Sequence, residues 1–510
     1  MKVNRRDFLK TAGATALMAC TDMKTARAYV PAHNWDKYNF GLGPSVKDRL
    51  NQGPFPEQLV PGWEVVMNTT PSSEVAPNFG MGLVTYLCDE VGPPNKKGET
   101  LAQSIEKLAK IPIGNKLYVR LNWKDVQKRP GRLDLCDHWK ITFEMAKKYN
   151  KRVGFRVMLS NPDIPGHAVP DFVAEKIPFV KLGKTTKTGL PGKVHYEPRY
   201  DNPFFQSAFK ELDDLLADAY NGHPHVEYMD TYMYGFWGEG HTWPFDGNPF
   251  PDYVTAERTF MAMFEHQLRN WSKTPLTTNT QPDCSKVGNS EILDRAVRSN
   301  NWLRTDTIFI ENMQIEALSN RPPWIAAAIE VGMSDGSPES LRIHEGLTYT
   351  DNVIYHVMDV GANYWSLWNW HRILADRILN YYNKYPEAIN KIARSIGYRV
   401  RPSWVWHYQN GEYPGLVIGF VNDGIAGVPG ALRVDVVSDD AKVRVGGCLD
   451  PGYPLPGKVR QAQFVLPKGT DWKGLKLEAE IEVKGMHYPV HWACHQKSNK
   501  DGSLTLRQNR

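Results

Sequence analysis

Residues 133–159 read LDLCDHWKITFEMAKKYNKRVGFRVML, and this stretch joins a helical pattern to a short strand. Apolar residues recur at helical spacing from Leu133 to Tyr149, whereas Arg152 to Leu159 form a compact apolar run of strand length. A helix of this length can cross over a sheet, so that the strands before and after it run parallel. The stretch therefore predicts one β/α unit of a parallel sheet.

The same alternation extends over residues 79–395. Further helical segments are predicted at Pro203–Tyr220, Tyr253–Trp271, Ser290–Ser299 and Ser340–Met358. Eight strands are predicted, at Met81–Cys88, Lys116–Asn122, Arg152–Leu159, Tyr228–Trp237, Leu276–Thr280, Thr307–Glu311, Trp324–Val331 and Ala362–Leu367. Eight β/α units in a segment of this length predict a (β/α)8 TIM barrel. A basic, Gly/Pro-rich insertion at residues 164–200 follows the third strand and should overhang the mouth of the barrel.

The sequence pattern changes on both sides of the predicted barrel. Residues 396–510 hold short apolar runs divided by Gly/Pro turns, which predicts a small all-β sandwich domain. Residues 30–78 are rich in Pro, Gly and Asn and read as an irregular arm leading into the barrel. One apolar piece of that arm, Trp63 to Met67, is long enough to add a strand.

Residues 1–29 are predicted to be a targeting leader. Asn4-Arg5-Arg6-Asp7-Phe8-Leu9-Lys10 precedes a short apolar run and resembles a twin-arginine export signal. The run is too short to span a bilayer. It ends in Leu17-Met18-Ala19-Cys20, which resembles a lipoprotein box except at Met18. Two outcomes stay open: a lipid anchor at Cys20, or cleavage near residues 26–28 that releases a periplasmic or secreted protein.

Charge and cysteine content narrow the class of partner. The leader carries four basic residues and one acid in its first ten, so the formal net charge of +5 falls to about +2 without it. This balance gives no electrostatic case for nucleic acid. Five cysteines remain beside Cys20, and Cys448 and Cys494 are close enough in sequence to form a disulfide. His241, His344, His356 and His371 show no metal-ligand spacing, so neither a metal nor a cofactor is predicted.

Reacting groups of such barrels lie at the carboxyl ends of the strands. The fourth strand leads into Trp237-Gly238-Glu239-Gly240-His241, which places a carboxylate between two glycines. The seventh ends at Glu330 after a nearly uncharged run, and an isolated charge there needs a purpose or a partner. We predict Glu239 and Glu330 as a catalytic pair, with Glu311 at the end of the sixth strand as the competitor of Glu330. Two carboxyl groups facing each other can cleave a glycosidic bond.

Other strand ends supply candidate substrate-binding groups. Guanidinium, amide and imidazole groups hydrogen-bond sugars or orient the carboxylates, and tryptophan faces pack against pyranose rings. The predicted substrate-binding residues are Arg120, Asn122, Trp237, His241, Trp243, Glu311, Trp365 and Trp368. For each tryptophan of the eighth strand the alternative is a place in the barrel core, and Arg156 in the third strand is expected to pair with an internal acid.

These features together resemble a clan A glycoside hydrolase, akin to β-galactosidase-like enzymes with a C-terminal β-domain. The resemblance rests on Tyr118–Trp123, on Gly238-Glu239, on Glu330 and on the tryptophans after the eighth strand, and it covers residues 79–395. It implies that Glu239 is the acid/base and Glu330 the nucleophile. The clan usually has Asn before its acid/base, whereas this chain has Gly238.

The resulting expectation is an exported retaining glycoside hydrolase that acts on β-linked oligosaccharides or polysaccharides. β-Galactosides are favoured, and the basic insertion adds anionic, sulfated algal galactans such as carrageenan. The alternative is a non-catalytic carbohydrate-binding barrel protein. The sequence makes no prediction of the oligomeric state.

Overall fold

The structure is a computed structural model that describes residues 63–87, 97–245, 249–280, 289–305, 318–330, 342–344, 347–348, 356–366 and 386–507, together with positions 354, 379 and 383. The leader and most of the predicted arm lie outside the described residues, and so do Glu311 and Trp368. None of the described helices is both long and apolar enough to cross a membrane.

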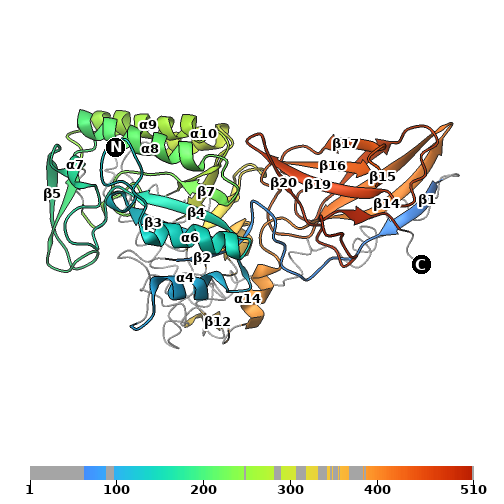
Figure 1. Ribbon diagram of the computed structural model, residues 1–510, viewed down its shortest axis with the longest axis horizontal. Coiled ribbons are helices and arrows are strands. Elements are labelled where there is room, and N and C mark those ends of the chain that lie inside the picture. The colour runs from blue at the N-terminus through green and yellow to red at the C-terminus, as the bar shows by residue number, and fades with distance from the viewer. Residues whose placement is uncertain are drawn as a thin grey trace, which may run out of the picture. The chain divides into compact units, whose positions relative to one another are not determined.

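Eight parallel strands close into a barrel, which confirms the predicted TIM barrel (Figure 1). In chain order they are β2 (Gly82–Tyr86), β3 (Gly114–Asn122), β4 (Arg152–Met158), β7 (Val226–Asp230), β8 (Leu276–Asn279), β9 (Trp302–Thr305), β10 (Ala327–Ile329) and β13 (Tyr364–Ser366). β13 pairs with β2 and closes the ring. The carboxyl ends of all eight strands therefore lie at one mouth.

Helices follow the strands on the outside of the barrel (Figure 1). They are α4 (Leu101–Ala109), α5 (Trp123–Val126), α6 (Asp137–Lys148), α8 (Pro203–Tyr220), α9 (Tyr253–Asn270), α10 (Asn289–Arg298) and α14 (Pro386–Ala393). Local sequence sets where they start: Thr100 and Gln103 form a capping box at α4, and Asn202 accepts from the first turn of α8 next to a proline at its start.

One predicted helix is wrong. The segment Ser340–Met358 contains a short antiparallel pair, β11 (Arg342–His344) and β12 (Leu347–Thr348), and the chain turns helical only near its end. His344 pairs with Leu347, so only two residues connect the strands. The pairing of Arg342 with Thr348 shows that extended backbone replaces the predicted helix in this part of the segment.

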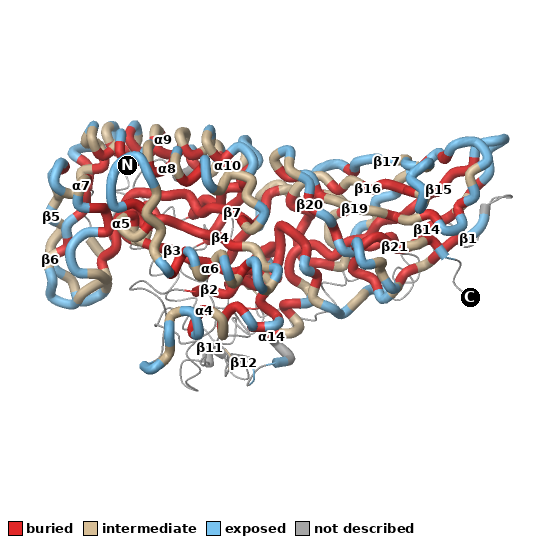
Figure 2. Tube along the Cα trace, viewed as in Figure 1, coloured by how far each residue is buried: buried red, intermediate tan, exposed pale blue. Residues whose placement is uncertain are grey.

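The insertion after β4 forms the short helix α7 (Asp171–Ala174) and an antiparallel hairpin of β5 (Phe179–Lys184) and β6 (Val194–Pro198). It follows the carboxyl end of a barrel strand, so it belongs to the mouth of the barrel. β5 is half-buried or exposed along its length, in contrast to the buried barrel strands, whereas β6 buries His195, Glu197 and Pro198 (Figure 2).

Two antiparallel sheets make up the late part of the chain, consistent with the predicted sandwich. One has the order β1 (Trp63–Asn68), β14 (Val400–Asn410), β15 (Tyr413–Asn422) and β18 (Val459–Val465). The other has the order β17 (Arg444–Cys448), β16 (Ala431–Val437), β19 (Lys476–Val483) and β20 (Met486–Pro489), with β21 (Leu504–Thr505) also on β19.

Residues from the two sheets meet in a shared core. Phe420 of the first sheet stacks on Trp492 at 5.8 Å, and the Trp492 indole donates to the Leu477 carbonyl of the second. One expectation is confirmed, and another needs correction. The predicted strand of the arm is present as β1 but pairs with β14, because its apolar residues find an open edge there rather than at the closed barrel. Cys448 is exposed and Cys494 is buried, and both are free thiols.

Candidate active site

The loop after β7 has an unusual backbone. β7 ends at Asp230, so the predicted strand to Trp237 is too long; the chain then turns through positive φ angles at Gly235 (82°), Trp237 (52°), Gly238 (75°) and Gly240 (83°). A Cβ at Gly235 would lie 2.1 Å from the His241 carbonyl, so glycine is required there. Positive φ at a tryptophan is strained, and such strain concentrates at functional sites. This turn aims Glu239 into the barrel mouth.

Glu239 is buried against two arginines. Its Oε1 atom accepts from Arg156 Nη1 at 2.8 Å and from Arg120 Nη1 at 3.2 Å, and its side chain is only 4% exposed. The two arginines are register neighbours on β3 and β4. Two guanidiniums side by side in a barrel need carboxylates between them, because a buried charge without a partner is costly.

Glu330 joins the same group from β10. It follows Ile329 directly, and its Oε1 atom accepts from Arg120 Nη1 at 3.1 Å. Both glutamates therefore contact one guanidinium nitrogen, so their Oε1 atoms are at most about twice that distance apart. The predicted pair is brought together in the barrel.

Two further members of the group were missed by the sequence reasoning. Arg304 forms an ion pair with Glu330 and lies 3.4 Å from Asp230. Asp230, the last residue of β7, also accepts from Arg156 at 3.1 Å and from Tyr118 and Thr277. The barrel contains β9 at Trp302–Thr305, so Arg304 lies in the barrel wall, whereas the predicted strand Thr307–Glu311 lies outside the described residues. The sequence does offer one indication of Arg304: it is a charged residue in the short run Trp302–Thr305, which comes directly after a predicted helix.

The resulting cluster holds three guanidiniums and three carboxylates, all buried: Arg120, Arg156, Arg304, Asp230, Glu239 and Glu330. Among the described residues, the charges of this cluster balance when every member is ionised. Burial alone would raise the pKa of Glu239, but the hydrogen bond with His241 and the charges of Arg156, Arg120 and Arg304 outweigh it. The pKa of Glu239 is therefore held well below its usual value.

His241 is oriented by its own loop. The backbone N–H of Trp243 donates to His241 Nδ1 at 3.2 Å, so the proton of the neutral ring lies on Nε2. Nε2 lies 3.4 Å from Glu239 Oε2, which makes His241 a hydrogen-bond donor toward that carboxylate.

Gly238 accounts for the departure from the clan pattern. A Cβ at this position would lie 3.2 Å from Arg156 Cδ, and the backbone φ of 75° disfavours other residues. An asparagine here would be strained and would press on the arginine that pairs with Glu239. A different amide lies nearby: Asn279, at the end of β8, donates to the Glu239 carbonyl at 3.2 Å.

The remaining predicted binding residues differ in their contacts and in their exposure. Asn122 ends β3 and accepts from Asn161 at 3.0 Å, and the half-buried Trp237 donates to Asp163 at 2.7 Å. Trp243 is 49% exposed, as a sugar platform must be. Trp365 is fully buried in β13, which favours the core alternative. Glu311 and Trp368 lie outside the described residues.

Glu197 is a second buried glutamate that the sequence reasoning did not select. It lies on β6 and accepts from the hydroxyls of Tyr200 (2.6 Å) and Ser160. Burial raises its pKa to about 7, against the opposing effect of these hydrogen bonds. Among the described residues, no group of three or more His, Cys, Asp or Glu side chains is arranged to hold a metal ion.

Comparison with known proteins identifies the leader. Residues 2–21 match the family described as the TAT (twin-arginine translocation) pathway signal sequence. The chain carries a twin-arginine export signal. Its lipoprotein box and its final location remain predictions. No curated protein matches the sequence significantly.

Solved structures with a similar fold include three glycosidases by name. A β-galactosidase from Rahnella sp. R3 has 11% identity and a TM-score of 0.40 over 66% of this chain and 59% of its own, less than two thirds of its length. Endo-glycoceramidase II from Rhodococcus sp. has 11% identity and a TM-score of 0.36 over 79% and 100%. A xylanase from Paenibacillus barcinonensis has 9% identity and a TM-score of 0.33 over 57% and 84%. These likenesses assign neither a reaction nor a substrate to this chain.

Proposed function

We propose that this protein is an exported retaining glycoside hydrolase that cleaves β-linked glycans. The observation that carries the proposal is the pair Glu239 and Glu330, whose Oε1 atoms lie 3.2 and 3.1 Å from the same nitrogen of Arg120. Retaining enzymes need carboxyl groups about 5 to 5.5 Å apart, whereas inverting enzymes leave room for a water at about 6.5 to 9.5 Å. The shared nitrogen favours the shorter separation.

Glu330 is the proposed nucleophile. It contacts both Arg120 and Arg304, and positive charge on two sides keeps a carboxylate ionised. An ionised carboxylate can attack the anomeric carbon and form a glycosyl ester. We prefer Glu330 to Glu311 because of these contacts. Glu311 lies outside the described residues.

Glu239 is the proposed acid/base. In the first step it must deliver a proton to the leaving oxygen, although the surrounding arginines favour its ionised form. The proposed source of that proton is solvent. His241 Nε2–H donates a hydrogen bond to Glu239 Oε2 and orients the carboxyl group, but a neutral imidazole that gave up this proton would become an imidazolate. In the second step the ionised Glu239 takes a proton from the attacking water.

Substrate contacts are proposed from the rim of the site. Trp243 offers an exposed aromatic face, and Trp237 is fixed by Asp163 beside it. Asn279 has a buried Oδ1 atom with no hydrogen-bond partner among the described residues, so it is the candidate for the sugar-hydroxyl contact that Asn provides in the clan pattern. β-Galactosides remain the favoured substrates by resemblance, and anchoring at Cys20 remains open.

One observation favours a second candidate function, a non-catalytic glycan-binding barrel. The charge-balanced cluster keeps Glu239 ionised, whereas a catalytic acid usually has a raised pKa. In this alternative the two glutamates only accept hydrogen bonds from sugar hydroxyls.

The test compares the mature protein with Glu330→Gln and Glu239→Gln on a panel of β-linked plant, host and algal glycans. Release of reducing sugar by the parent and its loss in both variants supports the proposal. Retained activity in Glu330→Gln would assign the nucleophile elsewhere, with Glu311 first in line. Glycan binding without release of sugar by the parent would establish the binding protein instead. Glu482→Gln on β19 is the matched control, because this glutamate is exposed and forms no ion pair within the described part of the chain.

A further inference from the structure

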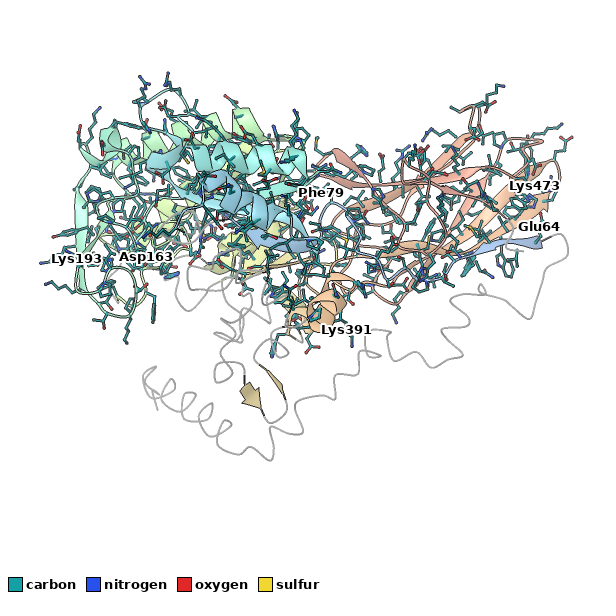
Figure 3. The ribbon with its side chains drawn as sticks, turned by 60° about the horizontal axis from the view of Figure 1, so that its bottom comes forward. Glu64, Phe79, Asp163, Lys193, Lys391 and Lys473 are labelled. Carbon is teal, nitrogen blue, oxygen red and sulfur yellow. The ribbon has the colours of Figure 1, made fainter. Side chains whose placement is uncertain are left out.

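A pocket of about 300 Å³ lies between the β5–β6 hairpin and the loop after β4. Its lining includes Asn161, Leu190, Lys193, His195, Glu197 and Phe236. Figure 3 shows Lys193 at the outer edge of this end of the molecule, on the same side as Asp163. The pocket lies beyond the cluster that holds Glu239 and Glu330, since it shares no lining residue with that cluster.

The floor of the pocket is continuous with the proposed site. Ser160 and Phe236 pair through a parallel bridge, and Phe236 precedes Glu239 by three residues in the same turn. Asn161 donates to Asn122, which ends the neighbouring strand β3. A glycan bound at the mouth would therefore have the pocket beside it.

His195 leaves a buried nitrogen without a partner. The residue is 6% exposed, and its Nε2 atom has no hydrogen bond among the described residues. Its ring is held against Phe236 and Phe245, and a Cβ at Gly189 would lie 2.4 Å from it. Leaving such a group unsatisfied costs about 1 to 3 kcal/mol, so its presence calls for a ligand or another explanation.

Lys193 supplies an available positive charge. It is exposed, lines the pocket, and forms no ion pair within the described part of the chain. Two other cations of the insertion are engaged, since Arg199 pairs with Asp201 at 2.8 Å and Lys176 lies 4.7 Å from the centre of the Phe204 ring. The acid in the lining, Glu197, is fully buried and hydrogen-bonded to two hydroxyls.

We propose that this pocket is a subsite for an oxyanion substituent of the glycan, a sulfate ester or a carboxylate, bound by Lys193 and His195. The Lys193 ammonium and the His195 imidazole N–H are both hydrogen-bond donors, and an oxyanion can accept from both. The only acid in the lining is Glu197, which is already hydrogen-bonded to two hydroxyls. The inference rests on the proposed function for the identity of the ligand as a glycan, and it narrows that function to acidic substrates.

The test measures binding by calorimetry in the Glu330→Gln background, so that affinity is read without turnover. The probes are oligosaccharides of carrageenan, of alginate and of desulfated carrageenan, which separate sulfate from carboxylate and from neutral sugar. Lys193→Ala is expected to weaken binding of one charged probe about tenfold or more and to leave the neutral probe unchanged. Lys187→Ala, an exposed lysine of the same hairpin outside the lining, is the matched control.

His195→Phe adds a second measurement. It removes the unpartnered nitrogen and keeps an aromatic ring, so the denaturation midpoint should hold or rise while affinity for the charged probe falls. Binding that depends on Lys193 but is accompanied by no hydrolysis in the parent would support the subsite and refute the hydrolase. Hydrolysis of neutral glycans with no effect of Lys193→Ala on any charged probe would overturn the subsite and leave the hydrolase standing.

Discussion

Arg156 is the position at which the charge balance of the cluster can be tested most directly. It donates to Glu239 at 2.8 Å, to Asp230 at 3.1 Å and to the Trp237 carbonyl at 2.9 Å. Arg156→Met keeps much of the side-chain volume but leaves three buried carboxylates facing two guanidiniums. Breaking a buried ion pair by removing one partner costs about 3 to 5 kcal/mol. That is a large part of the stability of about 5 to 15 kcal/mol typical of a folded protein.

The loss should depend on pH with a defined sign. The pKa of Glu239 is depressed in the folded parent, so its pairing stabilises the fold above the unfolded carboxyl pKa of about 4.3 and is lost as pH falls through the lower folded value. In Arg156→Met the carboxyl pKa rises, and below about pH 4 a proton can replace the missing charge. The stability difference from the parent should therefore be full at pH 7 and smaller at pH 4.

The assay is urea denaturation followed by tryptophan fluorescence at both pH values. Arg199→Met is the matched control, because Arg199 pairs with Asp201 at the same 2.8 Å but within reach of water, where an ion pair contributes about 0 to 1 kcal/mol. Arg156→Lys keeps the charge and should lose less at pH 7 than the Met variant. A loss in Arg156→Met below about 1 kcal/mol, or one equal at pH 7 and pH 4, would refute the charge-balance reasoning.

Four further outcomes are expected. Because burial raises the pKa of Glu197 to about 7, the parent should lose about 3 kcal/mol of stability between pH 5 and 8 that Glu197→Gln does not lose, as seen in denaturation midpoints against pH. Trp243→Ala should change stability by less than about 0.5 kcal/mol because the side chain is exposed, yet raise KM on the best substrate. Asn279→Ala should lower kcat about tenfold or more with little change in KM, since a sugar-hydroxyl contact that strengthens in the transition state acts on kcat. Glu239→Gln should retain far more of the parent's rate on a dinitrophenyl glycoside than on the natural glycan, because that leaving group departs without a proton; equal losses on both would argue against Glu239 as the acid.

The barrel could be predicted because its signal is local and repeated. In the described part of the chain β3, β4, β7, β8 and β9 each follow a helix, and the predicted eight units in one chain segment agree with the closed order of β2 to β13. The sixth strand shows where this reasoning stops. Ile308-Phe309-Ile310, which lies outside the described residues, is more apolar than Trp302-Leu303-Arg304-Thr305, so hydropathy alone does not select β9. Arg304 is accommodated in β9 because it pairs with Glu330, which follows the adjacent strand β10, and with Asp230 at the end of β7, and no local pattern records those partners.

The same limit applied to the site. Glu239 and Glu330 could be selected because each ends an apolar strand. The electrostatic environment of these two glutamates could not be predicted, because it depends on which arginines point toward the barrel axis and at which height along that axis they lie. The register of Arg120 beside Arg156 appears only once β3 and β4 are aligned. The pocket at His195 could not be predicted from the sequence either. Its lining comes from the loop after β4, the β5–β6 hairpin and Phe236, which are separated in sequence and meet only in the fold.

The charge balance of the cluster bears differently on the two steps of the proposed reaction. When Glu330 becomes a glycosyl ester it loses its negative charge, and three guanidiniums then face two carboxylates. Glu239 is thereby held ionised more firmly, which is the form a general base needs to activate water. The first step runs against the same field, because it needs a proton on Glu239 while all three arginines oppose it. A cluster of this kind favours breakdown of the intermediate over its formation, and it makes protonation of Glu239 the demanding part of the proposed reaction.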